Sequence, residues 1–240
     1  PHVDAGYTVK ALRTYVEASL KNTGLERLDL IQLHCPPTET FYRPEIFRLF
    51  EDLKQEGKIA NLGVSVEKVE EGLKAMQYEN VTTVQIIFNV FRQRPAQLFF
   101  REAEKNDIGI IVRVPLASGL LTGKFDQNSS FDKEDHRNFN RNGEAFDKGE
   151  TFSGIDFETG LQAVDQLKGI FPQVENLAPV ALQWILQHPE VSTIIPGASK
   201  VEHLMSNLSL YERPDLTSEE IEKMNAVYTE KIKPLVHQKW

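Results

Sequence analysis

Short apolar runs alternate with amphipathic helical patterns along most of this chain. Five of the runs have the length and composition of buried strands, and helical segments separate them. Strands that are apolar throughout and connected through helices are typical of a parallel sheet covered on both faces. The sequence therefore predicts an α/β fold, either an open doubly wound sheet or a (β/α)8 barrel. The predicted strands are 28–33, 59–66, 81–90, 108–116 and 191–197.

The helical segments are marked by apolar residues that recur with the period of an α-helix. Thr217 with Glu220 three residues later has the spacing of a capping box, which fixes the start of one helix. The segment 122–155 has no periodicity, so it is either a functional loop or locally disordered. The predicted helices are 9–21, 44–55, 66–77, 95–106, 157–171, 177–187, 201–210 and 218–236.

Charge and composition exclude several classes of protein. The chain has 27 Lys and Arg against 35 Asp and Glu, and it lacks the basic runs of a nucleic-acid-binding protein. Cys35 is the only cysteine, which excludes an internal disulfide framework and a zinc site built on several cysteines. No apolar stretch approaches the roughly 18 residues of a membrane-spanning helix. We therefore expect a cytoplasmic protein with no nucleic-acid or membrane partner.

Length bears on the choice between the two α/β folds. The 240 residues fit a single domain over 1–240, since (β/α)8 barrels have about 250 residues. A closed barrel needs eight strands, and the pattern predicts five. If the fold is a barrel, three strands are therefore missing.

Polar residues stand at the ends of the predicted strands, where barrels place their chemistry. His34 is either a satisfied buried histidine or a functional one. Gln85 either bonds the interior backbone or contacts a ligand, and Asn89 either forms a turn or contacts a ligand. Arg113 either forms an ion pair with a carboxylate or faces a substrate.

Two glycine-containing stretches, PLASGLLTGK at 115–124 and IPGASK at 195–200, follow predicted strands. Backbone amides in such turns and at helix N-termini form anion sites. Two of these turns on neighbouring strands are able to hold a pyrophosphate and a further phosphate. Neither stretch matches GxGxxG or the GxxxxGK[ST] phosphate loop.

These stretches stand in an ordered set: LDLIQLHCP, LGVSV, VQIIFNVF, VPLASGLLTGKF, DHRNFNRNG and STIIPGASKVEHLMSN. The set resembles the aldo-keto reductase family, most closely its bacterial-type branch, from about Tyr7 to the C-terminus. The resemblance implies a (β/α)8 TIM barrel, here a partial barrel with strands 4 to 8. It also implies reduction of aldehydes and ketones to alcohols with NADP(H) and without a metal.

The resemblance assigns roles to individual residues. His34 matches the active-site histidine that orients and polarises the substrate carbonyl. Ser65 and Gln85 match residues that bond the nicotinamide carboxamide, whereas Val66 replaces the usual asparagine of that motif. The segment 136–143 resembles a loop that packs over cofactor and substrate. The implied nucleotide contacts are Leu116, Ser118, Leu120 and Lys124 along the pyrophosphate, Gly197, Ala198, Ser199, Lys200 and His203 at the adenosine 2′-phosphate, and Asn207 at the adenine.

Two departures from the family affect the expected activity. Lys200 is the only permanent cation at the predicted 2′-phosphate site, so NAD(H) is also expected to bind. The family's catalytic Asp, Tyr and Lys lie on its first three strands, and Asp4, Tyr7 and Lys10 stand in the wrong context to replace them. We therefore expect little turnover from this chain alone, whose missing strands are present as a separate N-terminal peptide, are supplied by a partner chain, or are absent.

Two other functions fit the same residues. Some relatives of the family are regulatory subunits that bind the nucleotide without turnover while docked on a membrane protein. Another barrel enzyme with the same phosphate turns would act on a sugar phosphate. Nucleotide binding separates the second alternative from a reductase, and an aldehyde assay separates the first.

Overall fold

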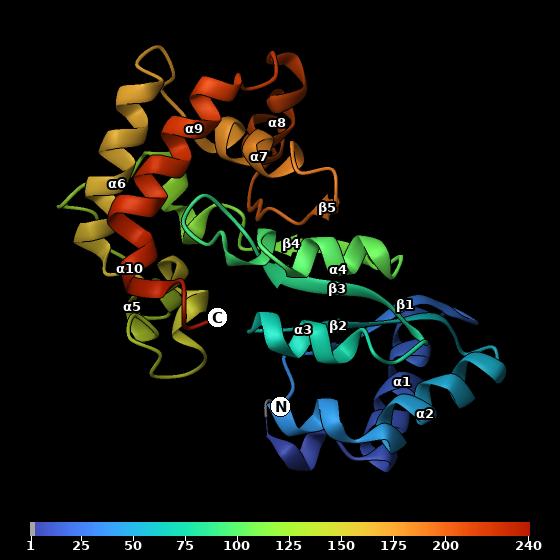
Figure 1. Cartoon of the computed structure of the whole chain (residues 1–240). Helices are drawn as coiled ribbons and strands as arrows, with labels where there is room; N and C mark the ends of the chain where they lie inside the picture. Colours follow the sequence, from blue (N-terminus) through green and yellow to red (C-terminus); the bar gives the residue numbers. More distant parts are fainter. Residues whose placement is uncertain (1–2) are drawn as a thin grey trace. The chain divides into compact units, whose positions relative to one another are not determined.

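A computed structural model describes residues 3–240 of the chain, which form two compact units (Figure 1). Unit 1 comprises residues 3–86 and 99–111, and unit 2 comprises residues 87–98 and 112–240. The strands are hydrogen-bonded in the order β1-β2-β3-β4-β5, which is also their order along the chain.

Unit 1 alternates strands and helices, as the apolar pattern predicts. Helix α1 begins where the Thr8 side chain accepts a hydrogen bond from the Ala11 amide, and it ends at Gly24, whose φ is 70°. Pro44 occupies the first turn of α2, where a missing amide proton costs nothing. The elements are α1 (Val9–Thr23), β1 (Leu28–His34), α2 (Pro44–Gln55), β2 (Ile59–Ser65), α3 (Val69–Ala75), β3 (Val81–Ile87), α4 (Phe99–Lys105) and β4 (Gly109–Arg113).

The first three strands of unit 1 run parallel in a fixed register. Leu28 lies beside Ile59 at the start of β1 and β2, and His34 lies beside Ser65 at their ends. Gly63 of β2 has no room for a side chain, because a Cβ there would lie 2.1 Å from Oγ1 of Thr83. This register brings the ends of neighbouring strands to one level.

Unit 2 contains most of the remaining helices. Helix α7 is apolar on nearly all sides and is buried, and its Trp184 stacks on Phe88 with the ring centroids 5.1 Å apart. Thr217 and Glu220 form the predicted capping box at the start of α9. The elements are α5 (His136–Phe139), α6 (Phe157–Ile170), α7 (Ala178–Leu186), β5 (Val191–Ile194), α8 (Val201–Leu208), α9 (Ser218–Val227) and α10 (Lys233–Val236).

The five predicted strands are all present, but β2 ends one residue earlier than predicted and three others end three residues earlier. Strand β4 ends at Arg113 because Val114 adopts a φ of 50°, which lies outside the β region. Strands β3 and β5 end at Ile87 and Ile194, before the predicted 90 and 197. Apolar residues continue past the end of each of these strands into a turn. Apolar periodicity does not distinguish such a turn from the strand before it, so the predicted strands are too long.

The aperiodic segment 122–155 is a folded loop built around the buried Asn140. The Asn140 Oδ1 accepts hydrogen bonds from the amides of Ala145 and Phe146, at 2.8 and 2.9 Å. Its Nδ2 donates to Oγ1 of Thr151 at 3.2 Å. The structure therefore shows a folded loop here, and its function stays a prediction.

Two expectations concern the chain as a whole. The expectation of a single domain over 1–240 stays a prediction, and residues 1 and 2 of that range lie outside the described part. Among residues 3–240, no helix is long and apolar enough to cross a membrane.

Candidate functional site

In unit 1, three predicted site residues lie in one row across neighbouring strands. His34 of β1 is beside Ser65 of β2, and Ser65 is beside Gln85 of β3. Side chains at matching positions of parallel strands point to the same face, so the register brings the three together. The His34 residue is exposed, which contradicts the reading of a buried structural histidine.

Two side chains of this row, those of Ser65 and Gln85, are linked by a hydrogen bond. The buried Ser65 hydroxyl donates to Oε1 of Gln85 at 3.5 Å and lies 3.4 Å from the Cys35 sulfur. Nε2 of Gln85 donates to Oε1 of Gln32 at 2.9 Å. The Val66 side chain is fully buried and has no polar atom, so it offers no substitute for the amide that the family has at that position.

Tyr7 lies next to His34 and lines the same cavity of about 170 Å³. Its hydroxyl donates to the main-chain carbonyl of His34 at 2.7 Å. Burial raises the pKa of this hydroxyl. The Tyr7 hydroxyl already donates its proton to a carbonyl and has a raised pKa. It is therefore a poor candidate for the family's proton-donating tyrosine.

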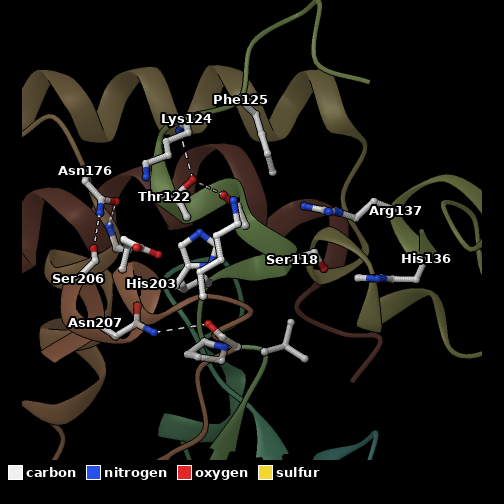
Figure 2. A pocket seen from close by; sticks show the side chains of 18 of the residues that line it. Ser118, Thr122, Lys124, Phe125, His136, Arg137, Asn176, His203, Ser206 and Asn207 are labelled. Atoms are coloured by element: carbon white, nitrogen blue, oxygen red, sulfur yellow. Dashed lines mark hydrogen bonds between the residues drawn. The ribbon is translucent and has the colours of Figure 1, made fainter. Parts of the chain in front are cut away.

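Unit 2 contains a larger pocket of about 1020 Å³. Figure 2 shows Asn176, Ser206 and Asn207 on one side of this pocket and His136 and Arg137 on the other. The pocket is lined by seven of the predicted nucleotide contacts, which are Leu116, Ser118, Lys124, Gly197, Lys200, His203 and Asn207. Three others do not line the pocket: Leu120 is buried, and Ala198 and Ser199 are exposed.

The turn after β4 forms one wall of this pocket and has an unusual backbone. Val114, Ala117 and Ser118 have φ values of 50°, 48° and 57°, a region that L-residues adopt only when surrounding contacts impose it. The Val114 carbonyl accepts from the Ala117 amide at 3.1 Å and from Nδ2 of Asn89 at 2.9 Å.

The same turn presents amides that the protein itself does not use. Among residues 3–240, the amide protons of Leu116 and Ser118 have no hydrogen-bond acceptor. Leu116 and Ser118 are half-buried, so their amides are open to water or to a ligand. Both residues line the pocket, so this turn is suited to bind an anion.

The start of helix α8 also lines the pocket, and the lining includes three charged side chains without an ion pair in the described part of the chain. Lys124, Lys200 and Glu202 line the pocket and form no ion pair with any residue in the described part of the chain. Nδ1 of His203 lies 3.2 Å from the Ser199 hydroxyl. The buried Asn207 donates to the Gly197 carbonyl at 3.5 Å, which holds the 195–200 turn against the helix.

The pocket also contains residues that the sequence did not identify one by one. His136 and Arg137 come from the loop predicted to pack over the cofactor, and Glu150 lies on the same loop. Arg137 pairs with Asp135, and the hydrogen bond lowers the pKa of Asp135 to about 2. The Arg137 guanidinium lies 4.5 Å from the centroid of the Phe131 ring. The sequence signal that could have identified Arg137 is the alternation of Arg and Phe at 137, 139 and 141.

A sequence model of the aldo/keto reductase family matches residues 1–229. The chain belongs to the aldo/keto reductase family. Two relatives are YqkF of Bacillus subtilis, an uncharacterized oxidoreductase, with 29% identity over 216 residues, and the L-glyceraldehyde 3-phosphate reductase of Escherichia coli O157:H7, with 26% identity over 230 residues. These alignments cover 90% and 92% of this chain, and the chain spans 65% and 64% of the two relatives.

A solved aldo/keto reductase structure shows the same fold. The glycerol dehydrogenase of Gluconobacter oxydans superimposes with a TM-score of 0.75 and 27% identity, over 94% of this chain and 66% of that protein. The predicted fold class is thereby confirmed as a partial aldo/keto reductase barrel with five parallel strands.

Proposed function

We propose that this chain carries the nucleotide-binding part of an NADP(H)-dependent oxidoreductase that reduces aldehydes and ketones to alcohols. One observation carries the proposal: the pocket of unit 2 is lined by two amides without internal acceptors and by two lysines without ion pairs. Such a donor set suits a ligand with more than one phosphate group.

The residues fit the parts of a nicotinamide nucleotide. The amides of Leu116 and Ser118 suit the oxygens of a pyrophosphate, with Lys124 supplying a charge. Lys200 and His203 suit an adenosine 2′-phosphate, and Asn207 suits the adenine. When bound, the nucleotide supplies the hydride for carbonyl reduction. NAD(H) is expected to bind as well, because Glu202 lines the same pocket and a carboxylate is able to accept a hydrogen bond from a ribose 2′-hydroxyl.

In unit 1, we assign to His34 the role of donating a hydrogen bond to the substrate carbonyl oxygen. To Ser65 and Gln85, in the same row, we assign contacts with the nicotinamide carboxamide, with the Ser65 oxygen as an acceptor because its proton is donated to Gln85. Carbonyl reduction also needs a proton donor whose pKa is near the working pH. Tyr7 does not meet this need, so we expect this chain alone to turn over carbonyl substrates slowly.

Titrating the purified chain with NADPH, with the nucleotide's fluorescence as the readout, tests the binding part of the proposal. Saturable binding that Lys200→Ala weakens is expected, and Lys223→Ala on α9 provides the matched control at an exposed lysine. Absence of binding would contradict the proposed function. The expected slow turnover is tested by following NADPH oxidation by absorbance in the presence of an aromatic aldehyde. Turnover at ordinary enzyme rates of about 1 to 1000 per second would contradict it.

A further inference from the structure

The hydroxyl of Ser118 makes two hydrogen bonds with the loop that faces it across the pocket wall. It donates to the main-chain carbonyl of Glu150 at 3.0 Å. It accepts from the amide of Phe152 at 3.1 Å. These contacts join the turn after β4 to the segment 150–153, about thirty residues further along the chain.

Two further contacts join the same two segments. The guanidinium of the buried Arg113 pairs with the Glu150 carboxylate. Nδ2 of the buried Asn89 bonds both the Val114 carbonyl, at 2.9 Å, and the Ser153 hydroxyl, at 3.0 Å. The five residues Asn89, Arg113, Ser118, Glu150 and Ser153 are called the clasp below.

A serine hydroxyl has a single proton to donate. In Ser118 that proton is used by the Glu150 carbonyl, whereas a phosphate oxygen accepts hydrogen bonds and needs a donor. The Ser118 side chain therefore has no proton for a phosphate while the clasp is closed. Its main-chain amide, in contrast, has no acceptor among the residues that the structure describes.

We propose that Ser118 and Glu150 are positioning residues, and that the clasp holds the turn 114–119 in the shape that presents its amides to the nucleotide's pyrophosphate. This inference rests on the proposed function and assigns Ser118 a role different from direct side-chain contact. Left-handed backbone at Val114, Ala117 and Ser118 persists only where surrounding groups impose it, and the clasp supplies those groups.

The first test compares NADPH with adenosine 2′-monophosphate, which lacks the pyrophosphate and reports only the end of the pocket at α8. Ser118→Ala and Ser118→Gly both remove the hydroxyl and keep the amide, and glycine also tolerates the positive φ. We expect each variant to weaken NADPH binding about three- to tenfold, the equivalent of one net hydrogen bond. Binding of adenosine 2′-monophosphate should be unchanged in both variants and in the exposed control Ser130→Ala.

The second test uses the ion pair of the clasp. Glu150→Gln should weaken NADPH binding as well, and the double variant with Ser118→Ala should lose less than the product of the two single losses, because both act on one segment. Glu222→Gln, at an exposed position of α9, is the charge-matched control. Thermal unfolding of every variant identifies any that lose the fold. If Ser118→Ala does not fold, Ser118→Gly provides the same test.

The outcomes separate the inference from the function on which it rests. If the unsubstituted protein binds neither probe, the proposed function itself fails. If it binds NADPH and the folded Ser118 variants bind NADPH equally well, the clasp has no positioning role. Equal losses for both probes would show general damage to the pocket and would also overturn the inference.

Discussion

The phenolic oxygen of Tyr228 lies 2.6 Å from Nδ1 of His237 in unit 2. Burial raises the pKa of Tyr228 to about 12. Burial also lowers the pKa of His237, and the charges of Lys233 and Arg94 lower it further. At neutral pH the protonated phenol therefore donates to a neutral imidazole, whose Nε2 lies 3.1 Å from Oε1 of Gln97.

Alkaline pH should weaken the fold through this pair. The folded pKa of Tyr228 lies above the unfolded value of about 10, so its contribution to stability is complete below pH 10 and is lost as the pH rises through about 12. Urea unfolding between pH 8 and pH 11 should show the free energy falling more steeply for the unsubstituted protein than for Tyr228→Phe. Parallel profiles would contradict the assigned pKa.

Breaking the Asp135–Arg137 pair should reduce nucleotide affinity more than stability. Arg137 lines the pocket, and the Asp135 carboxylate fixes it by accepting hydrogen bonds from its Nε and Nη2. Because the pair is partly exposed, Asp135→Asn should cost at most about 1 kcal/mol of unfolding free energy. The depressed pKa of Asp135 means that this contribution is present above pH 4 and lost as the pH falls through about 2.

Calorimetric titration with NADPH, with the exposed Glu134→Gln as control, measures the binding effect of that substitution. A roughly threefold or larger loss of affinity at pH 7 is expected for Asp135→Asn, equivalent to about 0.7 kcal/mol. Unchanged affinity would show that Arg137 does not need Asp135 to face the nucleotide.

The choice between NADPH and NADH should depend on two residues at the start of α8. Lys200→Ala should weaken NADPH about tenfold, as expected for a lost charge-assisted contact, and should leave NADH within about twofold. Glu202→Gln should shift the preference in the opposite direction, because it removes a carboxylate that repels a 2′-phosphate. Dissociation constants of both nucleotides for each variant measure the preference. If Lys200→Ala weakens NADPH and NADH equally, Lys200 does not contact the 2′-phosphate.

The capping box of α9 offers a prediction about stability alone. Thr217→Ala removes the side-chain oxygen that accepts from the Glu220 amide at 3.2 Å, at a cost of about 1 kcal/mol. Thr217→Ser keeps that oxygen and should restore most of the loss. Urea unfolding measures both variants, and nucleotide affinity should not change because α9 does not line the pocket.

The local sequence pattern predicted the strands and the two glycine-containing turns. Buried strands need runs of apolar residues and tight turns need glycine, so both are visible in short stretches of sequence. The local pattern did not predict where β4 stops, since Val114 is left-handed and its carbonyl accepts a hydrogen bond from Asn89, which lies 25 residues away in the sequence. Arg113 pairs with a carboxylate, which is one of the two roles that the sequence allows, but nothing local singles out Glu150.

The sequence predicted the main stretches of the candidate nucleotide site but not every residue that lines it. The turn 115–124 and the start of α8 were found from sequence and lie in one pocket, together with most of the residues assigned to them. The loop residue Arg137 was missed individually, because its place depends on how the loop folds around Asn140. The roles of His34, Ser65 and Gln85 stay predictions, although the strand register places them in one row.

The left-handed backbone of Val114, Ala117 and Ser118 bears on how fast a ligand is captured. A turn that already has its final shape loses its conformational freedom when the chain folds, so an incoming molecule has little left to order. Encounter would then be governed by diffusion and by the attraction of Lys124 and Lys200 for a polyanion. The association rate should fall as salt is added, whereas the time for which the ligand stays bound should hardly respond.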